Sequence, residues 1–283
     1  YGALGRIELG IHNVLINHGQ ESVIAWGRVN KARDSIPTIQ IGKKTDTYLH
    51  GLYTRLTDKC GFGSKHATET FLKEIDNYQP DLIQLHMLHG YYINLELFFG
   101  YLRDRGIPTV WTLHDSWALT GHCPCFDMIG CTKWKTGCNH CPQRSHHPTS
   151  WFFDRSEWNW NKKRELFNSV QNLTIVTPSK WMAEIVRESF LRNFPIRVIH
   201  NGIDMDVFKP TYGDISNRIG AEEKKIVLGV SSTWAPSKGL ADFCQLAEKL
   251  PNDYRIVLVG LNKKQIKMLP DRVIGIKKTE NLQ

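Results

Sequence analysis

Two adjacent polar residues stand where a buried strand is expected to end. His114 and Asp115 directly follow the near-continuous apolar run Thr109–Leu113, a pattern typical of a strand in a parallel sheet. Parallel α/β sheets bind their ligands at the carboxyl ends of the strands. A histidine there can exchange protons, and an adjacent carboxylate can fix its tautomer or its charge. We therefore favour a catalytic role for His114 and Asp115 over the alternative, a structural hydrogen-bonded histidine.

A lysine occupies a comparable position in the second part of the chain. The strand pattern 225–230 leads through a loop to Ser237-Lys238-Gly239, where a helix is expected to begin. The Ser237 hydroxyl can cap this helix, and Lys238 adds positive charge to the end at which the helix dipole is also positive. This arrangement suits a diphosphate, so Lys238 is the strongest predicted phosphate contact. The alternative is an exposed lysine at a helix start.

Thiols are concentrated in a polar segment at 120–150. Cys123, Cys131, Cys138 and Cys141 have the spacing C-x7-C-x6-C-x2-C. No signal-peptide pattern opens the sequence, so we expect a reducing compartment, where clustered thiols indicate a metal before disulfides. Four soft ligands could hold a structural zinc ion tetrahedrally. Free thiols within a loop are an equally weighted alternative.

Two glycine-containing segments carry weaker signals. Gly2-Ala3-Leu4-Gly5-Arg6 precedes a helical pattern, and its glycines would let a phosphate approach backbone amides at the helix start. It is not G-x-G-x-x-G, so a dinucleotide site is not supported, and from the residues alone an ordinary strand-to-helix turn is favoured. The segment 61–65 is only faintly similar to a phosphate loop, and we interpret it as a plain loop.

An aromatic and basic stretch follows the cysteines. Its members are Trp151, Phe152, Phe153, Trp158 and Trp160 together with Arg155, Lys162, Lys163 and Arg164. Such a stretch could rest on a membrane interface or hold a lipid-linked substrate. A buried helix with a solvated basic face explains the same residues, and we favour that interpretation slightly.

Strand and helix patterns alternate along the chain. Strands are expected at 22–26, 36–41, 82–86, 109–113, 173–176, 197–199, 225–230 and 255–259, with helices at 65–78, 93–105, 157–170 and 239–250 and a further amphipathic helix capped by Ser179. This alternation predicts parallel sheets covered by helices on both faces. A polar connector after Pro210 predicts two domains, 1–210 and 211–283, with a ligand-binding cleft between them.

The composition of the chain favours some classes of binding partner over others. The formal net charge is +8, which favours anionic ligands such as phosphates or anionic lipid, but the basic residues form no long block, so nucleic acid is not expected. No apolar run reaches the roughly 18 residues of a membrane-spanning helix. The sequence opens on Tyr1 rather than Met and stops at Gln283 without a closing element. We expect truncation at both ends, with a first strand lost before Tyr1.

In order and spacing, these segments together resemble a retaining glycosyltransferase of the group-1 (family 4) type, which has the two-domain GT-B fold. The matching segments are Gly2–Arg6, Trp111–Asp115, Val176–Ser179, Val198–Asp204, Phe208–Pro210, Ser237–Gly239 and Val257–Gly260. The cysteine-containing stretches 121–123 and 130–138 resemble a subgroup associated with bacterial exopolysaccharides such as colanic acid. The resemblance covers essentially the whole chain.

The resemblance implies roles for particular residues. His114 and Asp115 would lie near the transferred sugar as catalytic residues. Lys238 would neutralise the donor diphosphate in place of a metal, so no cofactor is required for catalysis. The remaining donor-site residues would be Gly5, Arg6, Ser232 and Gly260, with the first two beside the diphosphate and the acceptor. Retention is usually ascribed in this family to front-face attack within an ion pair, without a protein nucleophile.

The resemblance also implies partners and a location. Domain 1–210 would bind the acceptor, a saccharide or lipid-linked saccharide, and domain 211–283 would bind part of a nucleotide-sugar donor. A cytoplasmic enzyme is expected, with peripheral contact at the inner face of the plasma membrane.

Two departures from the family pattern qualify this expectation. Thr233 stands where the family often has an arginine, and the Glu-x7-Glu motif would lie beyond Gln283. We therefore expect residues 1–283 alone to be weakly active or inactive. Two alternatives remain open, namely a zinc-stabilised binding module without catalysis and another Rossmann-type nucleotide enzyme such as a dehydrogenase. A dehydrogenase would need the glycine fingerprint G-x-G-x-x-G, which this sequence lacks.

Overall fold

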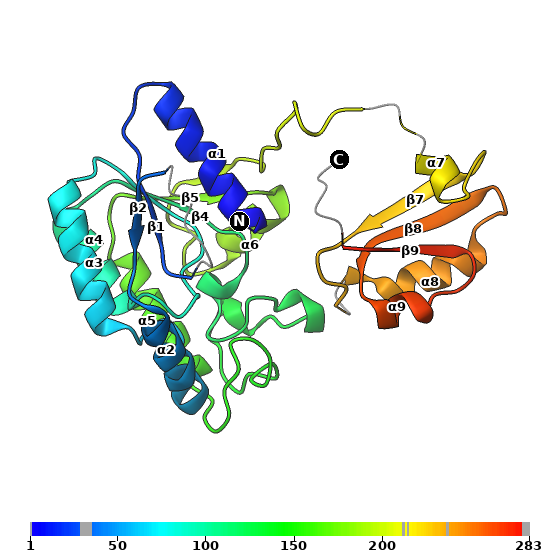
Figure 1. Ribbon diagram of the computed structural model, residues 1–283. Coiled ribbons are helices and arrows are strands. Elements are labelled where there is room, and N and C mark those ends of the chain that lie inside the picture. The colour runs from blue at the N-terminus through cyan, green and yellow to red at the C-terminus, as the bar shows by residue number, and fades with distance from the viewer. Residues whose placement is uncertain (1, 29–35, 211–212, 214, 236–237, 279–283) are drawn as a thin grey trace. The chain divides into compact units, whose positions relative to one another are not determined.

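The computed structural model describes residues 2–28, 36–210, 213, 215–235 and 238–278. The chain divides into two compact units, Tyr1–Gly202 (unit 1) and Ile203–Gln283 (unit 2), each drawn with its own sheets and helices in Figure 1. The sequence places the division at 210/211, whereas the contacts place it at 202/203. The residues that lead from one unit to the other therefore group with unit 2.

Unit 1 is built on parallel strands. A two-stranded sheet pairs β1 (Ile24–Trp26) with β2 (Thr38–Gln40). A four-stranded sheet has the order β3 (Ile83–Leu85), β4 (Thr109–Thr112), β5 (Leu173–Thr177) and β6 (Ile196–Val198). Every pairing in both sheets is parallel. The predicted α/β class is therefore confirmed, and all carboxyl ends of the larger sheet lie at the same edge.

Helices connect these strands. They are α1 (Ala3–Asn17), α2 (Lys44–Thr57), α3 (Lys65–Tyr78), α4 (Leu95–Arg105), α5 (Ser156–Asn168) and α6 (Lys180–Glu188). Side chains cap two of them as helix propensities favour. Asn94 Oδ1 accepts from the Leu97 amide, and Ser179 Oγ accepts from the Met182 amide, which confirms the predicted cap. Helix α2 was not predicted from the sequence.

An aromatic cluster holds β4 in place. Trp111 on β4 packs edge-on against Phe167 of α5 with ring centroids 4.9 Å apart, and Phe99 of α4 lies 4.4 Å from Phe167. All three side chains are buried, with at most 1% of their surface exposed. The Trp111 indole N–H also donates to the main-chain oxygen of His86 at 3.0 Å. Strand β4 and the residue after β3 are thus fixed to one another.

The segment 120–155 is ordered by buried polar bonds as well as by a small core. Phe126 and Trp134 pack within it, with tilted rings whose centroids are 4.8 Å apart. His122 Nδ1 lies 2.6 Å from the Asp58 carboxylate, and neither side chain is more than 1% exposed. The second Asp58 oxygen accepts from the Arg155 amide at 2.7 Å. Asp58 therefore ties both ends of the cysteine-containing segment to the end of α2.

Unit 2 repeats the parallel pattern in a smaller form. Its sheet has the order β7 (Lys225–Val230), β8 (Tyr254–Leu261) and β9 (Val273–Lys277), and its helices are α7 (Ile215–Arg218), α8 (Leu240–Lys249) and α9 (Lys263–Lys267). Buried Trp234, Ile256 and Leu258 form its core. Helix α8 begins one residue later than predicted, with Gly239 as the N-cap and no side-chain cap bond. Ser237, the predicted cap, lies outside the described residues.

Candidate active site

Two histidines meet where adjacent strands end. His86 follows β3 and His114 follows β4, and the β3–β4 register aligns Leu85 with Trp111. His86 Nδ1 and His114 Nε2 are 2.9 Å apart and share a hydrogen bond. The two rings are nearly parallel, at 17° with centroids 5.2 Å apart. His114 therefore lies after the end of a strand, as predicted, and His86 lies beside it after the neighbouring strand.

Asp115 is held by a second histidine. Its Oδ2 lies 2.7 Å from His89 Nε2, and its Oδ1 accepts from the Trp117 amide at 2.9 Å. The His89 ring packs against the Trp117 ring at 5.2 Å. The carboxylate therefore orients His89 and closes the turn after His114. It makes no hydrogen bond to the His114 ring within the described structure, so its predicted role as the tautomer-fixing partner of His114 is not what the geometry shows.

The environment keeps the histidine pair neutral. Burial, with a smaller contribution from the neighbouring His114, lowers the pKa of His86 to about 4. Burial also lowers the pKa of His114, against the opposing effect of Asp115. For Asp115, burial alone would raise the pKa, but the bonds from His89 and the Trp117 amide outweigh it and lower the pKa. Near neutral pH the site therefore contains a carboxylate beside two neutral imidazoles.

A buried lysine positions the turn that carries these residues. Lys163 of α5 is 1% exposed, and its Nζ donates to the main-chain oxygens of Trp117 at 2.8 Å and Thr120 at 3.0 Å. The ammonium group also lies 3.4 Å from the centre of the Trp117 ring, a cation–π contact. Burial lowers the pKa of Lys163 to about 7. The expectation that Lys163 belongs to a solvated basic face is therefore wrong, because the carbonyl oxygens of residues 117–120 provide its partners.

The predicted phosphate-binding glycine segment lies within a helix. Gly5 and Arg6 belong to the first turns of α1, which begins at Ala3 with Gly2 as its N-cap. Arg6 is exposed, and its amide donates to the Gly2 carbonyl at 3.2 Å. Glu8 of the same helix lies close enough to Tyr92, in the loop after β3, to raise the pKa of that tyrosine by its charge, after the larger effect of burial. Helix α1 thus begins near the loop that carries His86 and His89.

The donor residues predicted in unit 2 lie after β7 and near the end of β8. Ser232 and Lys238 are exposed in the loop after β7. Gly260 of β8 has φ +96°, and a Cβ there would lie 1.8 Å from the Ser231 main-chain oxygen. Only glycine allows this approach. Because Lys238 precedes the N-cap of α8, its charge lies just outside the helix rather than at its first residue.

The segment 61–65, which is faintly similar to a phosphate loop, bonds to a histidine of the same unit. The amides of Gly61 and Gly63 both donate to His50 Nε2, at 3.1 Å each. His50 Nδ1 therefore carries the proton and donates to Ser64 Oγ at 2.9 Å. These amides are already satisfied, so the interpretation of the segment as a plain loop agrees with the structure.

The four predicted zinc ligands come near one another. Cys123 is buried, while Cys131, Cys138 and Cys141 are half-buried, and all four are free thiols. A hydrogen bond from the Cys123 thiol to the Cys141 sulfur raises the pKa of Cys123 and lowers that of Cys141. Yet no three His, Cys, Asp or Glu side chains of the described residues are arranged to hold a metal ion. Zinc binding stays a prediction from the spacing.

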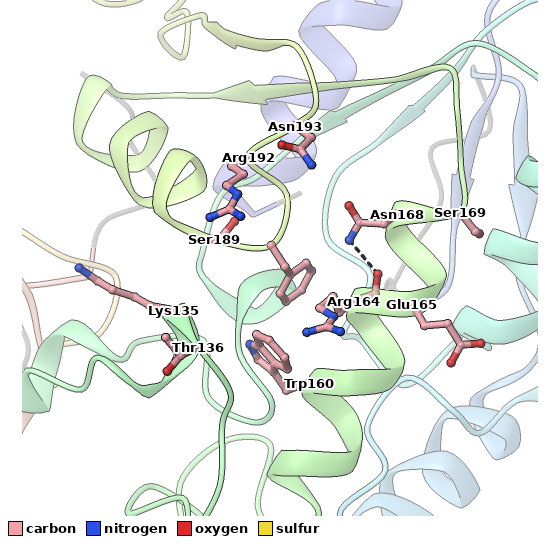
Figure 2. Close-up of a pocket in the computed structure, with 11 residues that line it drawn as sticks. Lys135, Thr136, Trp160, Arg164, Glu165, Asn168, Ser169, Ser189, Arg192 and Asn193 are labelled. Carbon is pink, nitrogen blue, oxygen red and sulfur yellow. Dashed lines mark hydrogen bonds between the residues drawn. The ribbon is translucent and has the colours of Figure 1, made fainter.

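A larger hollow lies elsewhere on unit 1. This pocket of about 620 Å³ is lined by residues of α5 and of the turn 189–193, including Trp160, Arg164 and Arg192 (Figure 2). None of the residues predicted for catalysis, donor binding or zinc lines it, although Trp160 and Arg164 belong to the aromatic and basic stretch. A smaller pocket is lined by His86, His89, His114 and Asp115. We place the chemistry in the smaller pocket, because ionisable side chains converge there at hydrogen-bonding distance.

The sequence reading missed His86, His89 and Lys163. A signal for the first was present, since His86 was assigned as the last residue of a strand pattern and so stands at a carboxyl end. No local pattern indicated Lys163, whose carbonyl partners are 43 and 46 residues away.

Parallel sheets in two units are the architecture of the GT-B fold. Solved structures agree. The chain matches the sucrose-phosphate synthase of Thermosynechococcus elongatus with TM-score 0.60 and 12% identity, over 99% of this chain and 66% of that one. It matches Anabaena HepE, solved in complex with UDP and glucose, with TM-score 0.56 and 16% identity, over 99% and 68%.

The chain belongs to glycosyltransferase family 4, whose family model matches residues 12–207. It is 35% identical over 217 residues to the Escherichia coli K12 protein WcaC, whose name assigns it as a glycosyl transferase to colanic acid biosynthesis. That alignment covers 72% of this chain and 52% of WcaC. The chain therefore spans about half the length of this relative.

Proposed function

We propose that this protein is a retaining glycosyltransferase of bacterial exopolysaccharide synthesis, which moves a sugar from a nucleotide-sugar to a hydroxyl group of a saccharide acceptor. Membership of family 4 and the similarity to WcaC support this class of reaction. The observation that carries the proposal is the convergence of His86, His114, His89 and Asp115 at the ends of two adjacent strands.

The histidine pair suits the recognition of sugar hydroxyls. Its internal hydrogen bond uses one nitrogen of each ring, and within the described residues His86 Nε2 and His114 Nδ1 have no other partner. Because both rings are held neutral, one of these free nitrogens donates and the other accepts, whichever tautomer is present. Neutral imidazoles also avoid repelling the positive charge that develops on the transferred sugar ring. In this proposal His114 contacts the transferred sugar, and Asp115 holds the turn that orients His114.

Donor binding belongs to unit 2 in this proposal. The exposed Lys238 ammonium would neutralise the diphosphate as it leaves, and Ser232 would contact the same group. The HepE structure in complex with UDP and glucose makes UDP the first nucleotide to test. Gly5 and Arg6, at the start of α1, would border the diphosphate and the acceptor. No metal is needed in this scheme, because the lysine supplies the positive charge.

The acceptor in this proposal is a lipid-linked or growing saccharide chain, handled at the inner face of the plasma membrane. Among the described residues, no helix is long and apolar enough to cross a bilayer. In this proposal the contact with the membrane is peripheral, through a surface of unit 1.

Nucleotide binding and sugar transfer can be tested separately. UDP at a hundred times its dissociation constant should raise the free energy of unfolding by about 2.7 kcal/mol. Lys238→Ala should remove this gain, whereas Lys249→Ala, at the end of α8, should leave it intact. His114→Asn should keep the UDP gain, and under conditions in which the unchanged protein transfers labelled sugar the variant should lose that transfer. If UDP, GDP and ADP all leave the unfolding curve unchanged, the donor-site assignment is wrong.

A further inference from the structure

Helix α2 presents its apolar side chains to solvent. Tyr48, Leu49, Leu52 and Leu56 are 75%, 64%, 44% and 39% exposed. The face turned inward instead buries His50, Gly51 and Thr54. Residues 48, 52 and 56 recur every four positions, so they form one stripe along the helix. This arrangement is the reverse of the usual surface helix, whose apolar stripe faces the core.

The orientation of α2 is fixed by its buried face. His50 accepts from the Gly61 and Gly63 amides, and its other ring nitrogen bonds to Ser64. Rotating the helix to bury its leucines would break these bonds and bring a histidine into water. The outward stripe is therefore a consequence of the folded structure, with no covering element among the described residues.

Three further exposed aromatic residues adjoin the end of this stripe. The Trp151 amide donates to the main-chain oxygen of Arg55 on α2 at 2.8 Å. Trp151, Phe152 and Phe153 are 51%, 65% and 51% exposed. We call these three residues, together with Tyr48, Leu49, Leu52 and Leu56, the apolar surface. It combines aliphatic and aromatic side chains from two segments about a hundred residues apart in the sequence.

Cationic side chains flank the apolar surface. Lys43 and Lys44 are exposed at the start of α2. The Arg144 guanidinium donates to the Phe152 main-chain oxygen at 3.0 Å, and that of Arg155 lies 5.6 Å from the Phe153 ring. The nearby acidic groups have partners, since Asp46 accepts from the Lys43 amide and Asp154 from the Cys141 amide and Ser156. With four cationic side chains against these two carboxylates, the fringe of this surface is positively charged.

We propose that the apolar surface is a membrane-docking site that lies on an anionic lipid bilayer. Helices that lie in the membrane interface combine an apolar face bearing leucines and aromatic rings with flanking Lys and Arg. Tryptophan rings favour the depth of the lipid headgroups, and each nearby cation is attracted to anionic lipid. The net charge of +8 has the same sign. The site rests on the proposed function and deepens it, because it would hold the enzyme at the membrane surface where the proposed lipid-linked acceptor lies.

Vesicle co-sedimentation tests the proposal. The protein should bind vesicles of mixed phosphatidylcholine and phosphatidylglycerol more tightly than pure phosphatidylcholine, and added salt should weaken this binding. Leu52→Glu and Trp151→Ala should each lower the partition coefficient by about tenfold. The matched controls are Leu82→Glu and Trp181→Ala, at positions 52% and 58% exposed on other parts of unit 1. Both controls should stay within about twofold of the unchanged protein.

Three outcomes would overturn the proposal. The protein could fail to bind either kind of vesicle, or the controls could weaken binding as much as the surface variants. The unchanged protein could also be a dimer in solution that Leu52→Glu dissociates, which would assign the apolar surface to a second copy. UDP-dependent stabilisation, measured on the same variants, separates this result from a failure of the proposed function, because no residue of the surface belongs to the donor site.

Discussion

Replacing His50 with glutamine should make the stability of unit 1 less sensitive to acid. His50 Nε2 accepts from two glycine amides, so protonation would direct an N–H at two other N–H groups. A glutamine carbonyl oxygen can accept from the same amides but does not titrate near neutral pH. His50→Gln therefore removes the titration while keeping an acceptor.

The magnitude follows from the pKa of His50. Burial, partly opposed by a hydrogen bond to the Tyr91 backbone, lowers it from 6.5 to about 4. The unfolded chain thus binds more protons than the folded chain between these values, so stability rises with pH there and is lost as pH falls. With these two values, protonation linkage costs about 0.2 kcal/mol at pH 7 and about 2.6 kcal/mol at pH 4.5. The expected change is about 2.4 kcal/mol.

Guanidinium unfolding followed by tryptophan fluorescence can measure this change. Only Trp234 of the nine tryptophans lies beyond residue 203, so the signal reports mainly on unit 1. The free energy of unfolding is compared between His50→Gln and the unchanged protein at both pH values, and groups common to both proteins cancel. The variant should gain about 2.4 kcal/mol relative to the unchanged protein between pH 7 and pH 4.5.

His66→Gln is the matched control, because the His66 side chain is 94% exposed and experiences little change on unfolding. Its difference from the unchanged protein should be the same at both pH values. If the His50→Gln difference also changes by less than about 0.5 kcal/mol, the glycine amides do not hold His50 neutral and the reasoning fails.

Two further predictions concern the donor loop and the thiols. Gly260→Ala should destabilise unit 2 by about 2–4 kcal/mol, measured by amide hydrogen exchange of its strands, because its Cβ would collide with the Ser231 oxygen at a positive φ. Gly213→Ala, which meets no atom within 4 Å, should have little effect, and an equal loss in both variants would contradict the argument. The purified protein should contain about one zinc per chain by metal analysis. Cys138→Ser should lower this content and Cys244→Ser should not, while a metal-free unchanged protein would leave the cluster as free thiols.

Local sequence patterns predicted much of the fold. The alternation of strands and helices gave the parallel sheets, because the apolar period of each element is a property of neighbouring residues. The positions of His114 and Asp115 followed in the same way, since a parallel sheet brings all its carboxyl ends to one edge. Ser179 was recognised as a cap from its place before an amphipathic helix, and the structure confirms the bond.

Local sequence patterns did not predict helix α2 or the burial of Lys163. The apolar stripe of α2 would ordinarily indicate a core-facing side, but the bonds of His50 turn it outward. Lys163 stands among basic residues that suggest a solvated face, yet the carbonyl oxygens of Trp117 and Thr120 satisfy its ammonium group inside the protein. In both cases the deciding partners are distant in sequence.

The sequence alone determined the class of the protein, the alternation of strands and helices that gives parallel sheets, and the strand end at which His114 stands. These features depend on local periodicity and on short ordered motifs. Only the tertiary structure shows that His86 bonds to His114 and that Asp115 bonds to His89 rather than to His114. It also shows that the apolar side chains of α2 are exposed. Those outcomes depend on strand register and on hydrogen bonds between residues far apart in the chain, which no local pattern encodes.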